Sequence, residues 1–160
     1  MSIRYTDKQI EQFFLEKKIL PEDYKNRIQL KDKRGHKEQE LDVKGSDGSD
    51  FKIIFRQSSF NNSDFSIIFA VNIEGSNQQF RLRRYNGKCH EHTNQMEGNT
   101  FYDFHTHTAT ARYQELGMNE DSFAEPSDKY SDFQGALRCL LGDCGFVLPT
   151  SPQLSLFGEV

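Results

Sequence analysis

The sequence of 160 residues lacks the features of a membrane or secreted protein. It contains no run of about 18 apolar residues, and no apolar segment of the signal-peptide type stands at its N-terminus. Its three cysteines, Cys89, Cys139 and Cys144, form no CxxC pair, which is typical of free thiols in a reducing compartment. We therefore expect a cytoplasmic protein that contacts no membrane.

Motifs of the common nucleotide-binding and zinc-dependent enzymes are also missing. The chain has no P-loop, no glycine fingerprint of a dinucleotide-binding fold, no HExxH and no internal repeat. Its net charge of −4 excludes a protein whose whole surface attracts nucleic acid. Basic residues are nevertheless concentrated in one segment, where Arg81, Arg83, Arg84 and Lys88 precede a pair of histidines.

Alternating apolar residues predict an antiparallel sheet in the middle of the chain. The clearest alternation runs from Phe65 to Ile73, and weaker ones begin at Phe51 and Phe80. The turn-forming segments between them are too short for the crossover helices that a parallel sheet requires. We predict a meander of about five or six strands over residues 40–108, with a short edge strand at 41–43.

Two helical patterns flank this sheet. Thr6 and Gln9 have the spacing of a capping box, which predicts an N-terminal helix over about 6–18. An apolar stripe that ends at Cys144 predicts a C-terminal amphipathic helix over about 130–144, capped by Ser131 and packed on one sheet face. Between the sheet and this helix, residues 117–128 are rich in acid and predict a loop. The fold class is therefore α+β, in a single domain of residues 1–160.

The strand that begins at Phe80 carries the arginines. Regular alternation places Arg84 on the face of Phe80 and Leu82, and Tyr85 on the opposite face. The following dipeptide, Asn86–Gly87, indicates either a tight hairpin between 80–85 and 88–92 or a bulge in one long strand.

Four of the five histidines form two His-x-His pairs, His90/His92 and His105/His107. Each pair shares a face if it lies on a strand, and Gly98 lies in a turn-forming segment between the pairs. Side-by-side imidazoles repel each other once they are protonated, so two such pairs indicate a functional site. We expect the four histidines on two adjacent strands, with at least three imidazoles in one cleft.

One interpretation of this site is metal-free acid–base chemistry. A pair of histidines can serve as acid and base near neutral pH. Arg84 or Arg112 would stabilise a pentacoordinate phosphate, and Tyr85 or Tyr113 would stack on a base or donate a proton. This combination is what RNA cleavage by 2′-OH attack requires. It predicts a histidine-centred phosphodiesterase or ribonuclease-like enzyme with RNA as its partner and no cofactor.

The alternative interpretation is a metal site. His-x-His on a strand presents two ligands at once, and imidazole suits divalent transition metals such as zinc. Asp103 shares a face with His105 and His107 on the strand predicted for residues 100–108, and Glu97 lies in the loop before it. His90 and His92 would complete a mixed set of histidine and carboxylate ligands.

Three segments carry a resemblance to known sequences. They are RYNG at 84–87, HEHTN at 90–94 and FHTHTATARY at 104–113. Together with the helix at 130–144 they cover somewhat under half of the chain, and they resemble small uncharacterised proteins from bacterial and mobile-element genomes. More loosely, the paired histidines resemble ribonuclease-like toxins of toxin–antitoxin systems. That likeness implies a cognate antitoxin or immunity protein as partner. A non-catalytic binding module of such a system is the third interpretation.

Overall fold

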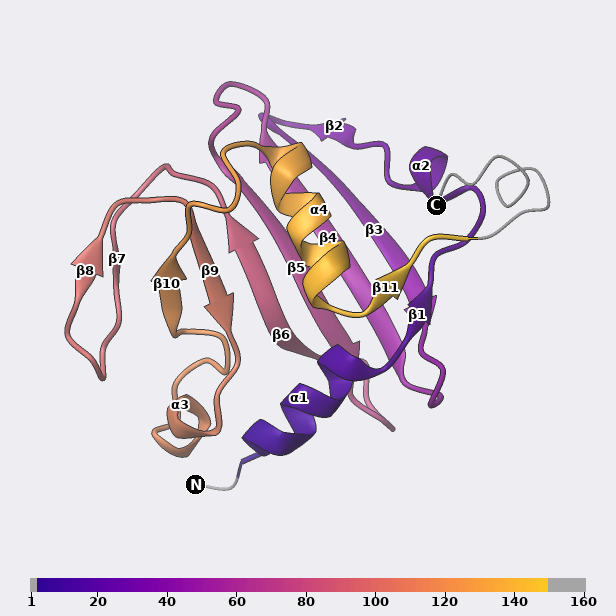
Figure 1. The fold of residues 1–160 in the computed structure, drawn as a ribbon. Coiled ribbons are helices and arrows are strands. Elements are labelled where there is room, and N and C mark those ends of the chain that lie inside the picture. Colours follow the sequence, from indigo (N-terminus) through magenta and orange to yellow (C-terminus); the bar gives the residue numbers. More distant parts are fainter. Residues whose placement is uncertain (1–2, 150–160) are drawn as a thin grey trace.

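The computed structural model describes residues 3–149 and has an α+β fold (Figure 1). No helix in this range is long and apolar enough to cross a membrane. The elements in chain order are α1 Asp7–Leu15, β1 Lys18–Ile19, α2 Tyr24–Arg27, β2 Lys31–Lys33, β3 His36–Lys44, β4 Asp50–Ser58, β5 Phe65–Asn72, β6 Gln79–Asn86, β7 His92–Thr93, β8 Thr100–Phe101, β9 His105–Thr108, α3 Ala111–Glu115, β10 Ala124–Pro126, α4 Phe133–Asp143 and β11 Phe146–Val147.

A seven-stranded antiparallel sheet in the order β10-β9-β6-β5-β4-β3-β2 forms the centre of the fold. The predicted meander is confirmed from β3 to β6, and β2, at residues 31–33, was not predicted. Strand β3 is nine residues long and lies inside the sheet, so the prediction of a short edge strand there was wrong. The prediction of a loop over 117–128 missed β10, which pairs with β9 through its backbone and has no alternating apolar pattern of its own.

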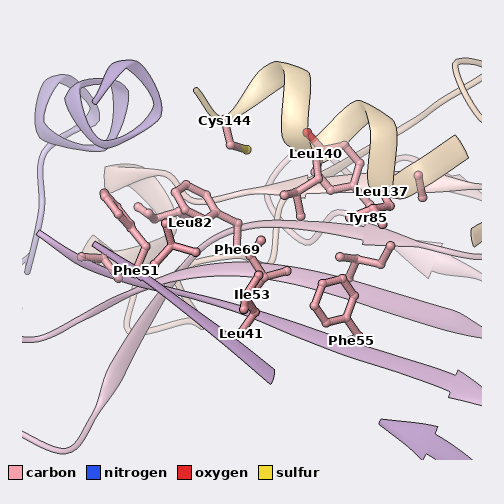
Figure 2. Packing of buried hydrophobic residues seen from close by; sticks show 14 of the residues in the cluster. Leu41, Phe51, Ile53, Phe55, Phe69, Leu82, Tyr85, Leu137, Leu140 and Cys144 are labelled. Atoms are coloured by element: carbon pink, nitrogen blue, oxygen red, sulfur yellow. The ribbon is translucent and has the colours of Figure 1, made fainter. Parts of the chain in front are cut away.

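Helices α1 and α4 lie on the same face of the sheet (Figure 1), as predicted for the C-terminal helix. Figure 2 shows the core between α4 and the strands, where Leu137 and Leu140 of α4 face the side of the sheet that carries Phe69 and Leu82. Phe69, Leu82 and Leu140 are fully buried. Burial of each such side chain contributes about 1.5–3 kcal/mol, and this face contains the main hydrophobic core.

Strand β6 contains a bulge at Leu82. Across the β5–β6 ladder Phe69 pairs with Arg83, whereas the next residue, Ala70, pairs with Arg81. Leu82 is therefore the extra residue, and its side chain stays in the core. After the bulge, each side chain of β6 points to the sheet face opposite to the one that strict alternation predicts.

The bulge reverses the predicted position of Arg84. Arg84 lies on the same face as Arg81, opposite to Phe80, Leu82 and Tyr85. The prediction that Arg84 shares a face with Phe80 and Leu82 was wrong, because it assumed uninterrupted alternation. Arg84 thus lies on the face of the sheet that α1 and α4 leave open.

Asn86–Gly87 forms neither the hairpin nor the bulge that the sequence predicts. Strand β6 ends at Asn86, and the amides of Gly87 and Lys88 donate to the carbonyls of Phe65 (2.9 Å) and Ser63 (2.8 Å). A Cβ on Gly87 would lie 1.8 Å from the Ser63 carbonyl oxygen, so this approach requires glycine. The chain then leaves the sheet and forms the separate β7–β8 hairpin (Figure 1). The predicted strand at 100–108 is accordingly divided into β8 and β9.

The helix ends differ slightly from the prediction. The capping box of Thr6 and Gln9 is confirmed, but α1 ends at Leu15 rather than near residue 18. Helix α4 begins at Phe133, and its cap is Asp132 instead of Ser131. The Asp132 carboxylate accepts a hydrogen bond from the Gly135 amide at 2.7 Å.

The buried side chain of Lys18 joins the two ends of the described chain. Its ammonium donates to the carbonyl oxygens of Phe13 and Glu16 (both 2.5 Å), at the end of α1, and of Cys144 (2.6 Å), at the end of α4. Burial lowers the pKa of Lys18 to about 8. Beside it, β1 pairs in parallel with β11.

Candidate metal centre

Three imidazoles lie together on the open face of the sheet. Strand β9 presents His105 and His107 on this face, and β7 brings His92 over them. The ring centroid of His92 lies 5.6 Å from that of His105 and 4.8 Å from that of His107. One ring nitrogen from each of the three histidines lies within 4.8 Å of the other two. The expected convergence of at least three imidazoles is confirmed.

The prediction that the two pairs lie on adjacent strands was wrong, although β9 lies within the strand predicted for residues 100–108. His105 and His107 belong to β9, whose neighbours in the sheet are β6 and β10, whereas His92 belongs to the β7–β8 hairpin. His90 precedes β7, is exposed, and has its ring centroid 6.0 Å from that of His105. Its Nδ1 lies 3.0 Å from Cys89 Sγ, and His90 is not part of the group with metal-ligand spacing.

The two β9 histidines are held in one tautomer by backbone carbonyls. Nδ1 of His105 lies 2.8 Å from the Asp103 carbonyl oxygen, and Nδ1 of His107 lies 2.8 Å from that of Asp121. Because a carbonyl oxygen only accepts, both Nδ1 atoms carry the proton. Each ring therefore keeps an unprotonated Nε2, as in metal-binding histidines whose other nitrogen is fixed by a carbonyl.

His92 is held in the same way by Asn94, a side chain that is 1 % exposed. The Ala124 amide donates to Asn94 Oδ1 (2.9 Å), and Asn94 Nδ2 donates to the Ala124 carbonyl (2.7 Å), so the orientation of the amide is fixed. His92 Nε2 lies 2.8 Å from the same Oδ1 and must donate to it. His92 therefore keeps an unprotonated Nδ1. The sequence predicted Asn94 only as part of the HEHTN segment and of a turn, and it did not predict this contact with β10.

Arg112 and Tyr113, predicted as possible phosphate and base contacts, hold the hairpin instead. Glu97, at its tip, forms an ion pair with Arg112 and accepts a hydrogen bond from the Tyr113 hydroxyl at 2.6 Å. That hydroxyl also accepts from the Met96 amide (3.2 Å). Glu97 is thereby engaged with α3, away from the three imidazoles.

Two further predicted residues do not reach the centre with their side chains. Tyr85 lies on the covered face, where its hydroxyl donates to the Asp143 carboxylate of α4 at 2.7 Å. The Asp103 carboxylate is exposed and does not belong to the histidine group, although its carbonyl orients His105.

Arg84 does lie at the centre, because it pairs with His107 across the β6–β9 ladder. Burial, and then the charge of Arg84, lowers the pKa of His107 to about 2. Burial also lowers the pKa of His105, and the neighbouring imidazoles of His92 and His90 lower it further. Both β9 histidines are therefore neutral at physiological pH.

A cavity of about 380 Å³ opens beside these residues. Its lining is polar and contains both the arginine and two of the three clustered histidines. The lining residues are Ser66, Arg84, Asn86, His90, His92, Thr93, Gln95, His107, Met118 and Ser122.

Comparison with protein-family models, curated proteins and solved structures finds no match for the chain. The resemblance to toxin–antitoxin proteins therefore stays a prediction.

Proposed function

We propose that His92, His105 and His107 bind a divalent transition metal, zinc by ligand type, and that the loaded centre is a hydrolase. One observation carries the proposal: in each of the three rings a carbonyl-type oxygen holds one nitrogen as a donor, which leaves the other nitrogen unprotonated and able to bind a metal. In His105 this nitrogen, Nε2, lies 3.4 Å from Asn86 Nδ2, and a metal would replace that long contact. Catalytic zinc centres use three protein ligands and leave a position open for water. The adjoining cavity provides access to such a position.

The spacing of the rings suits an ion after a small closure. Zinc holds imidazole nitrogens at about 2.0–2.1 Å, so nitrogens at neighbouring tetrahedral positions lie roughly 3.4 Å apart. Since the three ligand atoms lie within 4.8 Å of one another, they have to approach by at most about 1.4 Å. His92 belongs to a hairpin outside the main sheet, and its movement supplies this closure at the least cost to the core.

Charge states favour the metal over chemistry by the β9 histidines alone. An acid–base pair of histidines needs one imidazolium near neutral pH. The lowered pKa values of His105 and His107 keep both rings neutral, which is the state that binds a metal and the wrong state for a general acid. The charge of Arg84 is partly offset by Asp121, whose carboxylate lies 3.5 Å from its Nε.

The chemistry follows from the open coordination position. A divalent metal held by His92, His105 and His107 would lower the pKa of a bound water to about 7, and the chemistry it would supply is hydrolysis by that water. His90 lines the cavity without belonging to the ligand group, and in this proposal it transfers protons between the centre and solvent. A phosphodiester such as RNA is the first substrate to test, because Arg84 lies beside the centre.

The test begins with protein purified without an affinity tag. Elemental analysis and a zinc titration against a chromophoric chelator should give one metal per chain. His92→Ala should weaken zinc binding by about 100-fold or more because it removes a ligand, whereas His90→Ala should retain it. Zinc binding that is equal in the two variants would contradict the proposed ligand set.

Activity is tested separately by cleavage of a mixed RNA from pH 5 to 9, with and without EDTA. The metal mechanism predicts a rate that rises to a plateau above about pH 7 and is abolished by EDTA. A bell-shaped profile that EDTA does not change would instead support acid–base catalysis without a metal. Zinc binding without cleavage would reduce the function to a metal-dependent binding module.

A further inference from the structure

We infer that the cavity binds an oxyanion of the phosphate-ester type between the metal and Arg84. This inference rests on the proposed metal centre and adds the class of its ligand.

Arg84 lies next to one of the proposed metal ligands. Arg84 and His107 are direct partners on β6 and β9, and such cross-strand neighbours have Cβ atoms about 4.5–5.5 Å apart. Both side chains line the same cavity. A ligand atom on the metal is therefore within reach of the Arg84 guanidinium, which is the group best suited to bind an oxyanion through two parallel hydrogen bonds.

The contacts of Arg84 leave its guanidinium available. Within residues 3–149 it forms one ion pair, from Nε to Asp121 Oδ2 at 3.5 Å, and no hydrogen bond. Both of these atoms are buried and have no hydrogen-bond partner. The backbone carbonyl of Asp121 orients His107, so one residue positions both the arginine and a metal ligand. The side chain is thus held in place while its outer nitrogens have no protein partner to displace.

Charge supplies the driving force. Arg81 lies between Glu120 (3.5 Å) and Asp121 (3.3 Å), so the formal charges of the two arginines and two carboxylates balance without a metal. A divalent ion then leaves a formal charge of about +2 in a partly buried site, where screening by water is weak. An anion restores the balance, and its affinity should therefore depend on metal loading.

The wall of the cavity indicates what part of a ligand is recognised. It contains hydroxyl groups of Ser66, Thr93 and Ser122 and amides of Asn86 and Gln95. The Ser66 hydroxyl already donates to Asn86 (2.9 Å), and Thr93 shares a hydrogen bond with Thr100 (2.8 Å). Ser122 and Gln95 are therefore the groups best placed to donate to phosphate oxygens. Among the lining residues there is no Phe, Tyr or Trp. Recognition of RNA bases uses stacking on such rings, so this cavity reads the charged group and not the base.

The experiment uses the full chain, loaded with zinc, and measures binding of inorganic phosphate by calorimetry, with acetate as a second ligand. Zinc affinity is measured first for every variant. Phosphate should bind the loaded protein at least about tenfold more tightly than the metal-free protein, and more tightly than acetate binds. Arg84→Gln should weaken phosphate binding by about tenfold or more at unchanged zinc affinity. Arg138→Gln, a change of an exposed arginine on α4, should have no effect.

Arg84→Lys is the second variant, for the case that Arg84→Gln does not fold, because it keeps the positive charge opposite Asp121. It should retain zinc and still weaken phosphate binding, since lysine lacks the planar fork. Wild-type phosphate affinity in both Arg84 variants would overturn this inference, as would acetate binding as tightly as phosphate. Failure of zinc to bind would overturn the proposed function as well, whereas zinc binding without phosphate binding would overturn the oxyanion site alone.

Discussion

Replacement of Asn94 by alanine tests the structural basis of the centre. The Asn94 side chain lies within hydrogen-bonding distance of both backbone groups of Ala124, of Asn99 Oδ1 and of His92 Nε2. A typical intramolecular hydrogen bond contributes about 1 kcal/mol, and a stranded buried partner costs about 1–3 kcal/mol. Ala124 is fully buried, so we expect Asn94→Ala to lower the free energy of unfolding by about 3 to 4 kcal/mol.

The same substitution should also weaken the metal centre. Without Asn94 Oδ1 the tautomer and orientation of His92 are no longer fixed, and loss of such a supporting contact typically costs 10- to 100-fold in metal affinity. Asn99→Ala is the matched control, because it removes only one bond to Asn94, from an exposed residue of the same hairpin. It should change the free energy of unfolding by about 1 kcal/mol or less.

Urea unfolding followed by circular dichroism measures the first effect, and competition with a chromophoric chelator measures the second. The reasoning fails if Asn94→Ala is no more destabilising than Asn99→Ala. It also fails if Asn94→Ala folds, loses stability as expected, and still binds zinc with wild-type affinity. In that case the contact attaches the hairpin to β10 but does not organise the ligand.

Two further predictions concern stability. Burial lowers the pKa of Lys18 from 10.5 to about 8, so between these pH values the unfolded chain binds more protons than the folded one. The difference in the free energy of unfolding between wild type and Lys18→Met should therefore rise by about 3 kcal/mol from pH 7 to 10.5. Urea unfolding at several pH values measures this difference, and a flat or falling difference would contradict the prediction. Gly87→Ala places a Cβ 1.8 Å from the Ser63 carbonyl oxygen and should lower the midpoint of thermal unfolding by several degrees, equivalent to about 1–3 kcal/mol. The reading of this contact is wrong if the variant melts at the wild-type temperature.

The sequence was sufficient for those features that depend on local patterns. Alternation from Phe65 onward predicted the central strands, and the apolar stripe before Cys144 predicted α4. The spacing of two His-x-His pairs predicted that imidazoles would gather. Each of these signals is contained within one element or one short repeat of residue types.

Features that depend on pairing between distant segments were beyond the sequence. The bulge at Leu82 exists only relative to β5, and it decides which face Arg84 occupies. Strand β10 is three residues defined by backbone bonds to β9. Asn94 acquires its role from Ala124, thirty residues further along the chain. No local sequence pattern predicts such contacts, because each partner, taken alone, has the sequence context of an ordinary turn or loop residue.

The Lys18 ammonium has a consequence for synthesis of the chain. The Cys144 carbonyl partner of Lys18 and the β11 strand beside β1 are translated more than a hundred residues after Lys18. Until then the lysine has only the α1 carbonyls, and the sheet face that α4 covers remains exposed. Contacts at such long sequence separation form slowly, because the intervening loop must close first. A nascent chain on the ribosome therefore carries an uncovered apolar sheet face until α4 emerges, and such a face is prone to aggregation in that interval.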